Sequence, residues 1–344
     1  MASADLPGPG AWQRAERHLR MIITMIVVLA GAAAVSMWSI EGPPEPQYPN
    51  RSDWSPLGYT YSLALFGFPL LALAGWFLGH RRKSPLHGKA FGLTLLAVFP
   101  LWCVIDLLLA NRFFLFPNKN AHIDPMFWGF EAGKGWTRSI PYEEFAFYLG
   151  AVMVLVLLYL WASEVWYSRY NLPDGEYRRL ARTTPPLVEV NWRTVWLGLA
   201  SLATVILYKK LGPHPYHDGL PEYFMLLWAL ATIPTALLVR RLSPFMNDRA
   251  LLFTIMASLL VSLLWEVTLA LPNGWWNYRH EHMMGLFIVP WTHLPFEETL
   301  LWPISGWSNV LLFELFRVRL YSGRPFRELL FGAPSAKGST ARPV

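Results

Sequence analysis

The sequence has few charged residues and almost no cysteine. Asp, Glu, Lys and Arg make up 15% of its 344 residues, against roughly 25% in an average soluble protein. The single cysteine, Cys103, lies inside an apolar run, which excludes an intrachain disulfide and any metal site built from several cysteines. This composition indicates a membrane protein.

Several site motifs are missing as well. No Gly-x-Gly-x-x-Gly follows a candidate strand, so nothing predicts a dinucleotide-binding domain. The sequence at 280–282, His-Glu-His, lacks the His-Glu-x-x-His spacing that places two metal ligands on one helical face, and surface or hydrogen-bonding histidines are favoured there. The Asp-rich motifs of membrane prenyltransferases are also missing. We therefore expect no metal and no cofactor.

Long apolar runs are abundant, since 54% of the residues are hydrophobic. A helix needs about 20 apolar residues to cross a bilayer. These runs predict an all-α, polytopic membrane bundle of about eight helices, of which the run at 194–208 is the shortest. A cleaved signal peptide is the alternative for the first run, disfavoured by the long, acid-containing segment before it. The candidate spans are 21–38, 59–79, 91–110, 141–163, 194–208, 222–239, 251–271 and 295–316.

Basic residues gather in alternate connections. Arginine clusters precede the first run and follow the second, fourth, sixth and eighth, whereas Lys209 and Lys210 break the pattern. By the positive-inside rule, these connections and both chain ends are expected in the cytoplasm, with the protein in a bacterial inner membrane. The net charge of +6 is thereby explained by the basic connections that orient the protein in the membrane, and we expect no nucleic-acid partner.

The two halves of the chain resemble each other. The sequence at 81–85, Arg-Arg-Lys-Ser-Pro, matches Arg-Arg-Leu-Ser-Pro at 240–244, and each half carries four candidate spans in the same order. This pattern predicts a parallel repeat, with each half crossing the membrane in the same direction. The expected organisation is a cytoplasmic segment at 1–20, a first membrane repeat at 21–166, a cytoplasmic linker at 167–193, a second membrane repeat at 194–320 and a disordered tail at 321–344.

Each half also places one carboxylate inside an apolar run and a Pro-x-Glu-Glu at the start of the next run. Proline and acidic residues suit a helix start, so a single copy is explained by capping. A charge inside the membrane costs on the order of 2.5–3.5 kcal/mol, and capping does not account for the two acids within the runs. Neighbouring helix positions point about 100° apart, so one Glu of each pair should face the bundle. We expect six candidate catalytic carboxylates on one leaflet: Asp106, Glu143, Glu144, Glu266, Glu297 and Glu298.

The loops before each Glu pair are rich in aromatic residues. Such rings attract a carbocation by roughly 0.5–2 kcal/mol each, although anchoring at the membrane interface is an equally good explanation for any single one. The candidate substrate-binding residues are Trp128, Trp275, Trp276, Asn277 and Tyr278.

At these residues the chain resembles the lycopene cyclase domain family, the membrane proteins of heterodimeric bacterial and fused archaeal and fungal carotenoid cyclases. The second half is the closer match, through Trp265-Glu266, Trp-Trp-Asn-Tyr at 275–278, Leu-Pro-Phe-Glu-Glu at 294–298 and Glu314. The resemblance covers about 59–166 and 222–320. The family's aspartate after Trp is Glu266 here, and the loop at 111–140 is long.

The resemblance implies proton-initiated, redox-neutral ring closure on a linear carotenoid in the bilayer, with membrane lipid and other carotenoid enzymes as partners. Glu143 and Glu297 would be the principal acids, Glu144 and Glu298 would tune them or accept protons, and the two remaining acids would assist. Two alternatives stay open. The first is a terpene cyclase acting on another prenyl substrate, and the second is a transporter or scaffold whose acids bind protons or cations.

Overall fold

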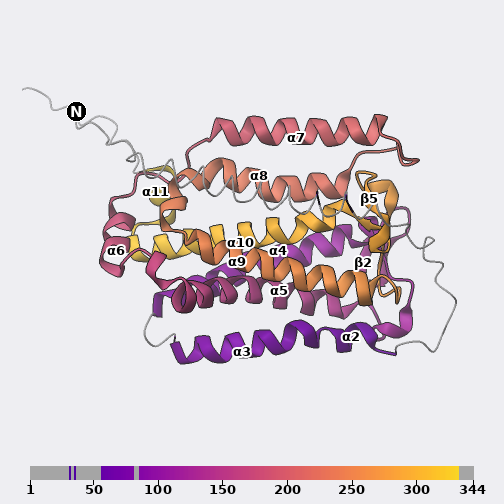
Figure 1. The fold of residues 1–344 in the computed structure, drawn as a ribbon, viewed down its shortest axis with the longest axis horizontal. Coiled ribbons are helices and arrows are strands. Elements are labelled where there is room, and N and C mark those ends of the chain that lie inside the picture. Colours follow the sequence, from indigo (N-terminus) through magenta and orange to yellow (C-terminus); the bar gives the residue numbers. More distant parts are fainter. Residues whose placement is uncertain (1–30, 32–34, 36–55, 81–84, 333–344) are drawn as a thin grey trace, which may run out of the picture.

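The computed structural model describes residues 31, 35, 56–80 and 85–332, which form a bundle of long helices with short strands at one end (Figure 1). Within these residues, six helices are long and apolar enough to cross a membrane. The chain is therefore a mostly helical membrane protein. The six are Gly58–Gly79, Leu86–Phe113, Tyr142–Trp166, Trp192–Leu211, Glu222–Phe245 and Asp248–Ala270.

Seven of the expected spans correspond to helices, and the eighth, at 21–38, falls almost wholly outside the described residues. The run at 194–208 belongs to a 20-residue helix. The long elements are α2 (Gly58–Ser62), α3 (Ala64–His80), α4 (Pro85–Phe113), α5 (Tyr142–Trp161), α7 (Trp192–Leu211), α8 (Glu222–Leu242), α9 (Asp248–Trp265) and α10 (Phe296–Ser322).

Helix α10 lies at the centre of the bundle, where it packs against α4, α5, α8 and α9. It carries Glu297, Glu298 and Glu314, all buried, so its composition is too polar to mark it as a membrane span. Surrounding helices shield these groups from lipid, which is where ionisable residues are tolerated at membrane depth. Helices α3 and α7 lie on opposite sides of the bundle (Figure 1).

The strands lie in the two loops that precede α5 and α10. They are short additions to a mostly helical bundle, and their pairing satisfies backbone groups that no helix takes up. Strand β1 pairs with β4, β2 with β3, and β5 with β6, all antiparallel. Their bounds are β1 (Phe114–Leu115), β2 (Phe127–Glu131), β3 (Gly135–Ile140), β4 (Asn277–Tyr278), β5 (Phe287–Ile288) and β6 (Leu294–Pro295).

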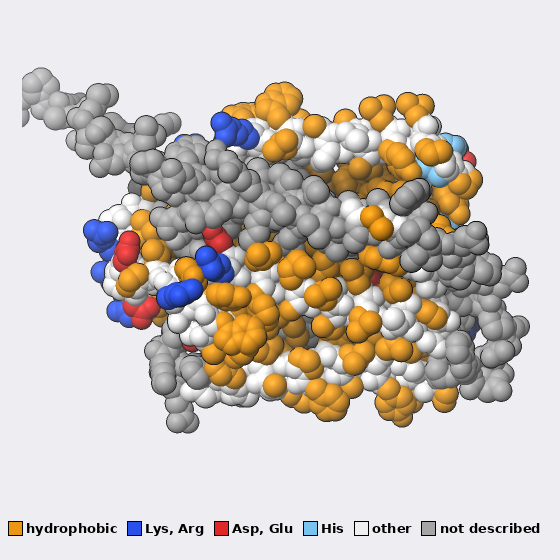
Figure 2. Space-filling view, in the orientation of Figure 1, with side chains coloured by type: hydrophobic (Ala, Val, Ile, Leu, Met, Phe, Trp, Pro, Cys, Tyr) orange, Lys and Arg blue, Asp and Glu red, His pale blue; other side chains and the backbone are white. Residues whose placement is uncertain are grey.

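The opposite end holds the linker helix α6 (Asp174–Thr183) and the short helix α11 (Phe326–Phe331). Lys and Arg side chains are visible near this end, while hydrophobic side chains cover the sides of the helices (Figure 2). The expectation of a disordered tail was wrong for α11, because Leu329 is fully buried and its carbonyl accepts the N–H of Leu187 at 2.9 Å. Residues 333–344 lie outside the described residues.

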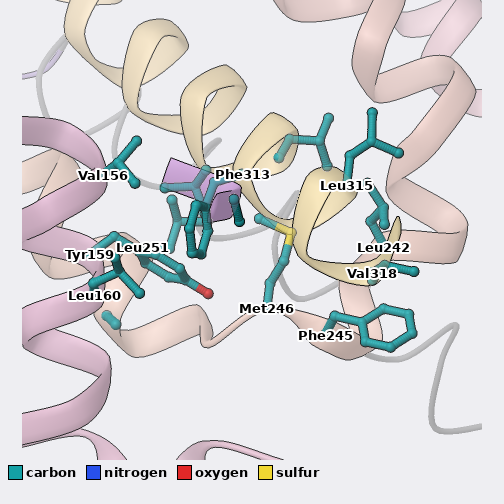
Figure 3. Packing of buried hydrophobic residues seen from close by; sticks show 14 of the residues in the cluster. Val156, Tyr159, Leu160, Leu242, Phe245, Met246, Leu251, Phe313, Leu315 and Val318 are labelled. Carbon is teal, nitrogen blue, oxygen red and sulfur yellow. The ribbon is translucent and has the colours of Figure 1, made fainter. Parts of the chain in front are cut away.

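A hydrophobic cluster fills the bundle near the linker end, where Val156, Leu251 and Phe313 are fully buried (Figure 3). Within it, the buried Glu314 accepts hydrogen bonds from the hydroxyls of Tyr159 at 3.0 Å and Tyr177 at 2.9 Å. Arg317 donates to the same carboxylate at 3.2 Å. A buried charge with this many donors holds α5, α6 and α10 together.

Candidate functional site

A cavity of about 750 Å³ lies at the strand-bearing end of the bundle, and its walls come from both halves of the chain. On α5 the lining runs from Glu144 to Leu155, and on α10 it runs from Glu298 to Asn309. Eleven residues of helix rise about 16 Å, so the cavity extends from the helix starts deep into the bundle. Three carboxylates face it: Glu144, Glu266 and Glu298.

The second glutamate of each Pro-x-Glu-Glu is held by a buried tyrosine. The hydroxyl of Tyr59 donates to Glu144 Oε1 at 2.8 Å, and the hydroxyl of Tyr223 donates to Glu298 Oε1 at 2.7 Å. Tyr59 lies near the start of α2 and Tyr223 near the start of α8. The two halves therefore present the same Tyr–Glu pair to one cavity.

The first glutamate of each pair points elsewhere. Glu143 Oε1 accepts the backbone N–H of Ile123 at 2.8 Å, and also the hydroxyl of Thr60. Glu297 Oε1 likewise accepts the backbone N–H of Met284. Both are buried but neither lines the cavity, because adjacent helix positions point about 100° apart. The geometry thus brings Glu144 and Glu298 to the cavity in place of the expected principal acids, and Glu143 and Glu297 fasten the loops before α5 and α10 to these helices.

The two remaining carboxylates differ in how they reach the glutamates. Asp106 is buried on α4, and its Oδ1 accepts the hydroxyl of Tyr148 at 2.9 Å. Tyr148 also lies next to Glu144 in the wall of the cavity. Glu266, at the start of a π-helical turn (Glu266–Ala270), is hydrogen-bonded directly to Glu298. Two carboxyl groups can share a hydrogen bond only when one of them carries a proton.

Aromatic rings make up much of the remaining wall. Phe66 stacks on Trp302 at 6.1 Å, and Trp265 packs on Trp276 at 4.8 Å between ring centroids. Trp102, Phe114, Phe116, Phe147, Trp265, Trp276 and Trp302 line the cavity together with four tyrosines. An aromatic, water-poor wall strengthens every electrostatic interaction inside it.

The expected substrate-binding residues divide between the cavity and its surroundings. Trp276 and Tyr278 line the cavity. Trp275 is buried behind it, stacked on Tyr59 at 6.1 Å. Asn277 accepts the N–H of Tyr278 in a local turn, so its side chain is used by the loop. Trp128 lies on the β2–β3 hairpin, 48% exposed, beneath the guanidinium of Arg138.

Among the residues of the site that were not singled out from the sequence are Tyr59, Tyr148, Tyr223 and Trp302. The sequence contains a pattern that could have identified two of them. Tyr59 and Tyr223 lie near the starts of α2 and α8, and these helices come before the apolar runs that carry Asp106 and Glu266. The other two lie four residues after Glu144 and Glu298, one helical turn along the same face.

His122 lies behind the first Tyr–Glu pair, in the loop before α5. Its ring meets that of Tyr59 edge-on, with 5.4 Å between centroids. Burial lowers the pKa of His122 to about 4, although the nearby carboxylate of Glu143 acts in the opposite direction. The ring is therefore neutral at pH 7 and adds no positive charge beside the carboxylates.

Among the described residues, no group of three His, Cys, Asp or Glu side chains is placed to hold a metal ion. Comparisons of the chain with protein-family models, with curated proteins and with solved structures found no match. The residues of the cavity and their geometry therefore carry the functional conclusion.

Proposed function

We propose that this chain is a membrane cyclase that closes a ring at the end of a linear carotenoid by adding a proton to it. The observation that carries this proposal is the cavity itself, in which three carboxyl groups, two of them next to each other, meet aromatic walls. A hydrocarbon end group offers nothing to bind but its π electrons and apolar surface. Acid, base and a dry aromatic enclosure are the requirements of cation chemistry on such a substrate.

The reaction balances without an oxidant or reductant. A carboxyl proton adds to the terminal double bond and leaves a tertiary cation at C1. The electron pair of the C5–C6 double bond then forms the ring bond to C1, and a carboxylate removes a proton to leave a β, ε or γ ring. The apolar, aromatic lining suits an end group of the substrate, and the rest of the carotenoid chain would lie in the lipid.

Both halves contribute to this one site in the proposal. The matched pairs, Tyr59 with Glu144 and Tyr223 with Glu298, support a parallel repeat in which 21–38 would be the counterpart of α7 and complete eight spans. Strands β1 and β4, one from each half, pair across the mouth of the site. The basic end, with α6 and α11, would face the cytoplasm of a bacterial cell.

Expression in cells that accumulate lycopene tests the proposal. The wild type should convert the linear pigment to ringed products, measured by chromatography and absorption of the extracted pigments. Glu298→Gln removes one carboxyl group of the Glu266–Glu298 pair at nearly constant size, and it should lower conversion roughly 100-fold or more. Glu176→Gln, on the exposed face of α6, is the matched control and should convert normally. Full-length wild type that forms no ring from any linear carotenoid would instead favour a transporter or scaffold.

A second candidate is a cyclase for an oxygen-bearing prenyl chain. Asn309 is buried at the inner end of the cavity, and no described residue donates a hydrogen bond to its Oδ1. Ser305 lines the cavity one turn away. A hydroxyl on the substrate would satisfy the amide oxygen of Asn309, so hydroxylated linear prenyl chains belong in the same assay.

A further inference from the structure

The two halves of the cavity are not equivalent, and the difference assigns separate tasks to them. We infer that Glu266 delivers the proton to the substrate and that Glu144, supported by Tyr148 and Asp106, takes the proton back. This inference rests on the proposed cyclase function. It goes beyond that function by dividing acid and base between the halves.

In the second half, hydrogen bonds converge on Glu298. Tyr223 donates to it at 2.7 Å, and Tyr278 and Glu266 are also hydrogen-bonded to it. Hydroxyl donors stabilise a carboxylate, so Glu298 is the ionised member of the pair. The shared proton therefore belongs to Glu266, which lines the cavity beside the aromatic wall.

In the first half, a hydroxyl stands between the two acids. Tyr148 has a single hydroxyl proton, and it donates that proton to Asp106 at 2.9 Å. Its oxygen can then accept a hydrogen bond from Glu144 once Glu144 has gained a proton. Tyr59 occupies the other oxygen, Glu144 Oε1. This arrangement suits a group that begins ionised and ends protonated, which is the task of a base.

The sequence explains why the halves differ. Four residues after Glu144 comes Tyr148, whereas four residues after Glu298 comes Trp302, which has no hydroxyl. The third acid is Asp106 in the first half, and its counterpart Glu266 is longer by one methylene. Glu266 also opens a π-helical turn, a local change of helix geometry that occurs frequently at functional sites.

The step balances between these groups. The O–H bond of Glu266 breaks, and its proton forms a C–H bond at C2 with the π electrons of the terminal double bond. After ring closure, a C–H bond beside the new cation breaks, its electron pair forms the ring double bond, and its proton goes to Glu144. One proton has then moved from Glu266 to Glu144. Between turnovers, Glu144 releases its proton to solvent and Glu266 takes up another, which restores the starting state.

The test compares Glu266→Gln with Glu144→Gln, with the full-length protein in lipid vesicles that contain lycopene in deuterated water. Glu266→Gln should lower ring closure about 100-fold or more. Glu144→Gln should still consume substrate and place deuterium at C2. In this variant, the cyclised carbocation of the substrate should lose a proton from another carbon or capture water. The ratio of β, ε and γ rings to cyclic alcohols should therefore change. Tyr148→Phe and Asp106→Asn should shift that ratio in the same direction.

Ring closure at the wild-type rate by Glu266→Gln would overturn the assignment of the acid. An unchanged product ratio in Glu144→Gln would overturn the assignment of the base. The assignment would also fail if Glu144→Gln lost as much substrate consumption as Glu266→Gln while the protein still unfolded cooperatively on heating. Glu266→Asp withdraws the acid by one methylene and should also slow ring closure.

A spectroscopic readout separates this inference from the proposed function. The infrared carbonyl band of a protonated carboxyl, identified by its shift in deuterated water, should weaken in Glu266→Gln and persist in Glu144→Gln. An unchanged band in Glu266→Gln would overturn the inference even if no substrate were ever turned over. A wild type that shows the band but closes no ring would sink the proposed function and leave the protonation assignment standing.

Discussion

At the scale of single residues, His122 couples the stability of the fold to pH. Because burial lowers its pKa to about 4 while the unfolded chain titrates near 6.5, the unfolded state takes up a proton first as the pH falls. The contribution of the neutral His122 ring to the free energy of unfolding is therefore complete above pH 6.5. It declines toward pH 4, by up to about 3 kcal/mol. Thermal unfolding in detergent at pH 7 and pH 4.5 should show a smaller difference for His122→Gln than for the wild type.

The matched control is His217→Gln, which alters an exposed histidine and should keep the wild-type pH dependence. Equal pH dependence in His122→Gln and the wild type would show that the ring of His122 does not resist protonation. Comparison between variants is needed, because the buried carboxylates also change charge in acid.

Part of the site was predictable from the positions of its acidic residues. The rest depended on the direction in which each side chain leaves its helix. The position of the acids inside apolar runs predicted that they would gather in the bundle. Which glutamate faces the cavity depends on where α5 and α10 begin, since a shift of one residue turns every side chain by about 100°. Trp128 and Asn277 lie in loops, where no periodicity indicates the direction of a side chain.

At the scale of elements, the apolar runs predicted the helices because a bilayer requires continuous hydrogen-bonded spans of this length. The strands were not predictable in the same way. Strands β1 and β4 are two residues long and pair across loops far apart in the sequence, so no local alternation marks them. Helix α11 was missed because its stability comes from contacts with the linker, and its sequence is short.

The loops form two sets whose placement predicts a topology. Asn118 N donates to Gly274 O at 3.0 Å, so the loops before α5 and α10 share one end, whereas α6 belongs to the other. Within the described residues, the arginine-rich connections lie at the α6 end, and the positive-inside rule predicts that this end faces the cytoplasm. Reporter fusions at Pro117 and Asn273 should therefore report an external location, and a fusion at Gly175 a cytoplasmic one. The reverse pattern at all three sites would invert the orientation.

At the scale of the whole molecule, the two halves are joined at both ends. At the strand-bearing end, Arg112 of the first half forms a two-point ion pair with Glu222 of the second, beside the β1–β4 pairing. At the other end, Glu314 of the second half accepts hydrogen bonds from Tyr159 of the first half and from Tyr177 of the linker. The cavity between the two halves is thus lined by residues of both, and neither half can form it alone.

One shared cavity sets the order in which a symmetrical substrate is modified. A carotenoid with two equivalent ends would present one end to the carboxylates of both halves while the other remains in the lipid. If the protein is the cyclase proposed above, the carotenoid would have to leave, turn around and bind again before its second end reacts, so we expect distributive catalysis. With substrate in excess, time courses should show the one-ringed product accumulating before the two-ringed product. Two-ringed product formed from the start, without that lag, would require both ends to be processed in a single encounter.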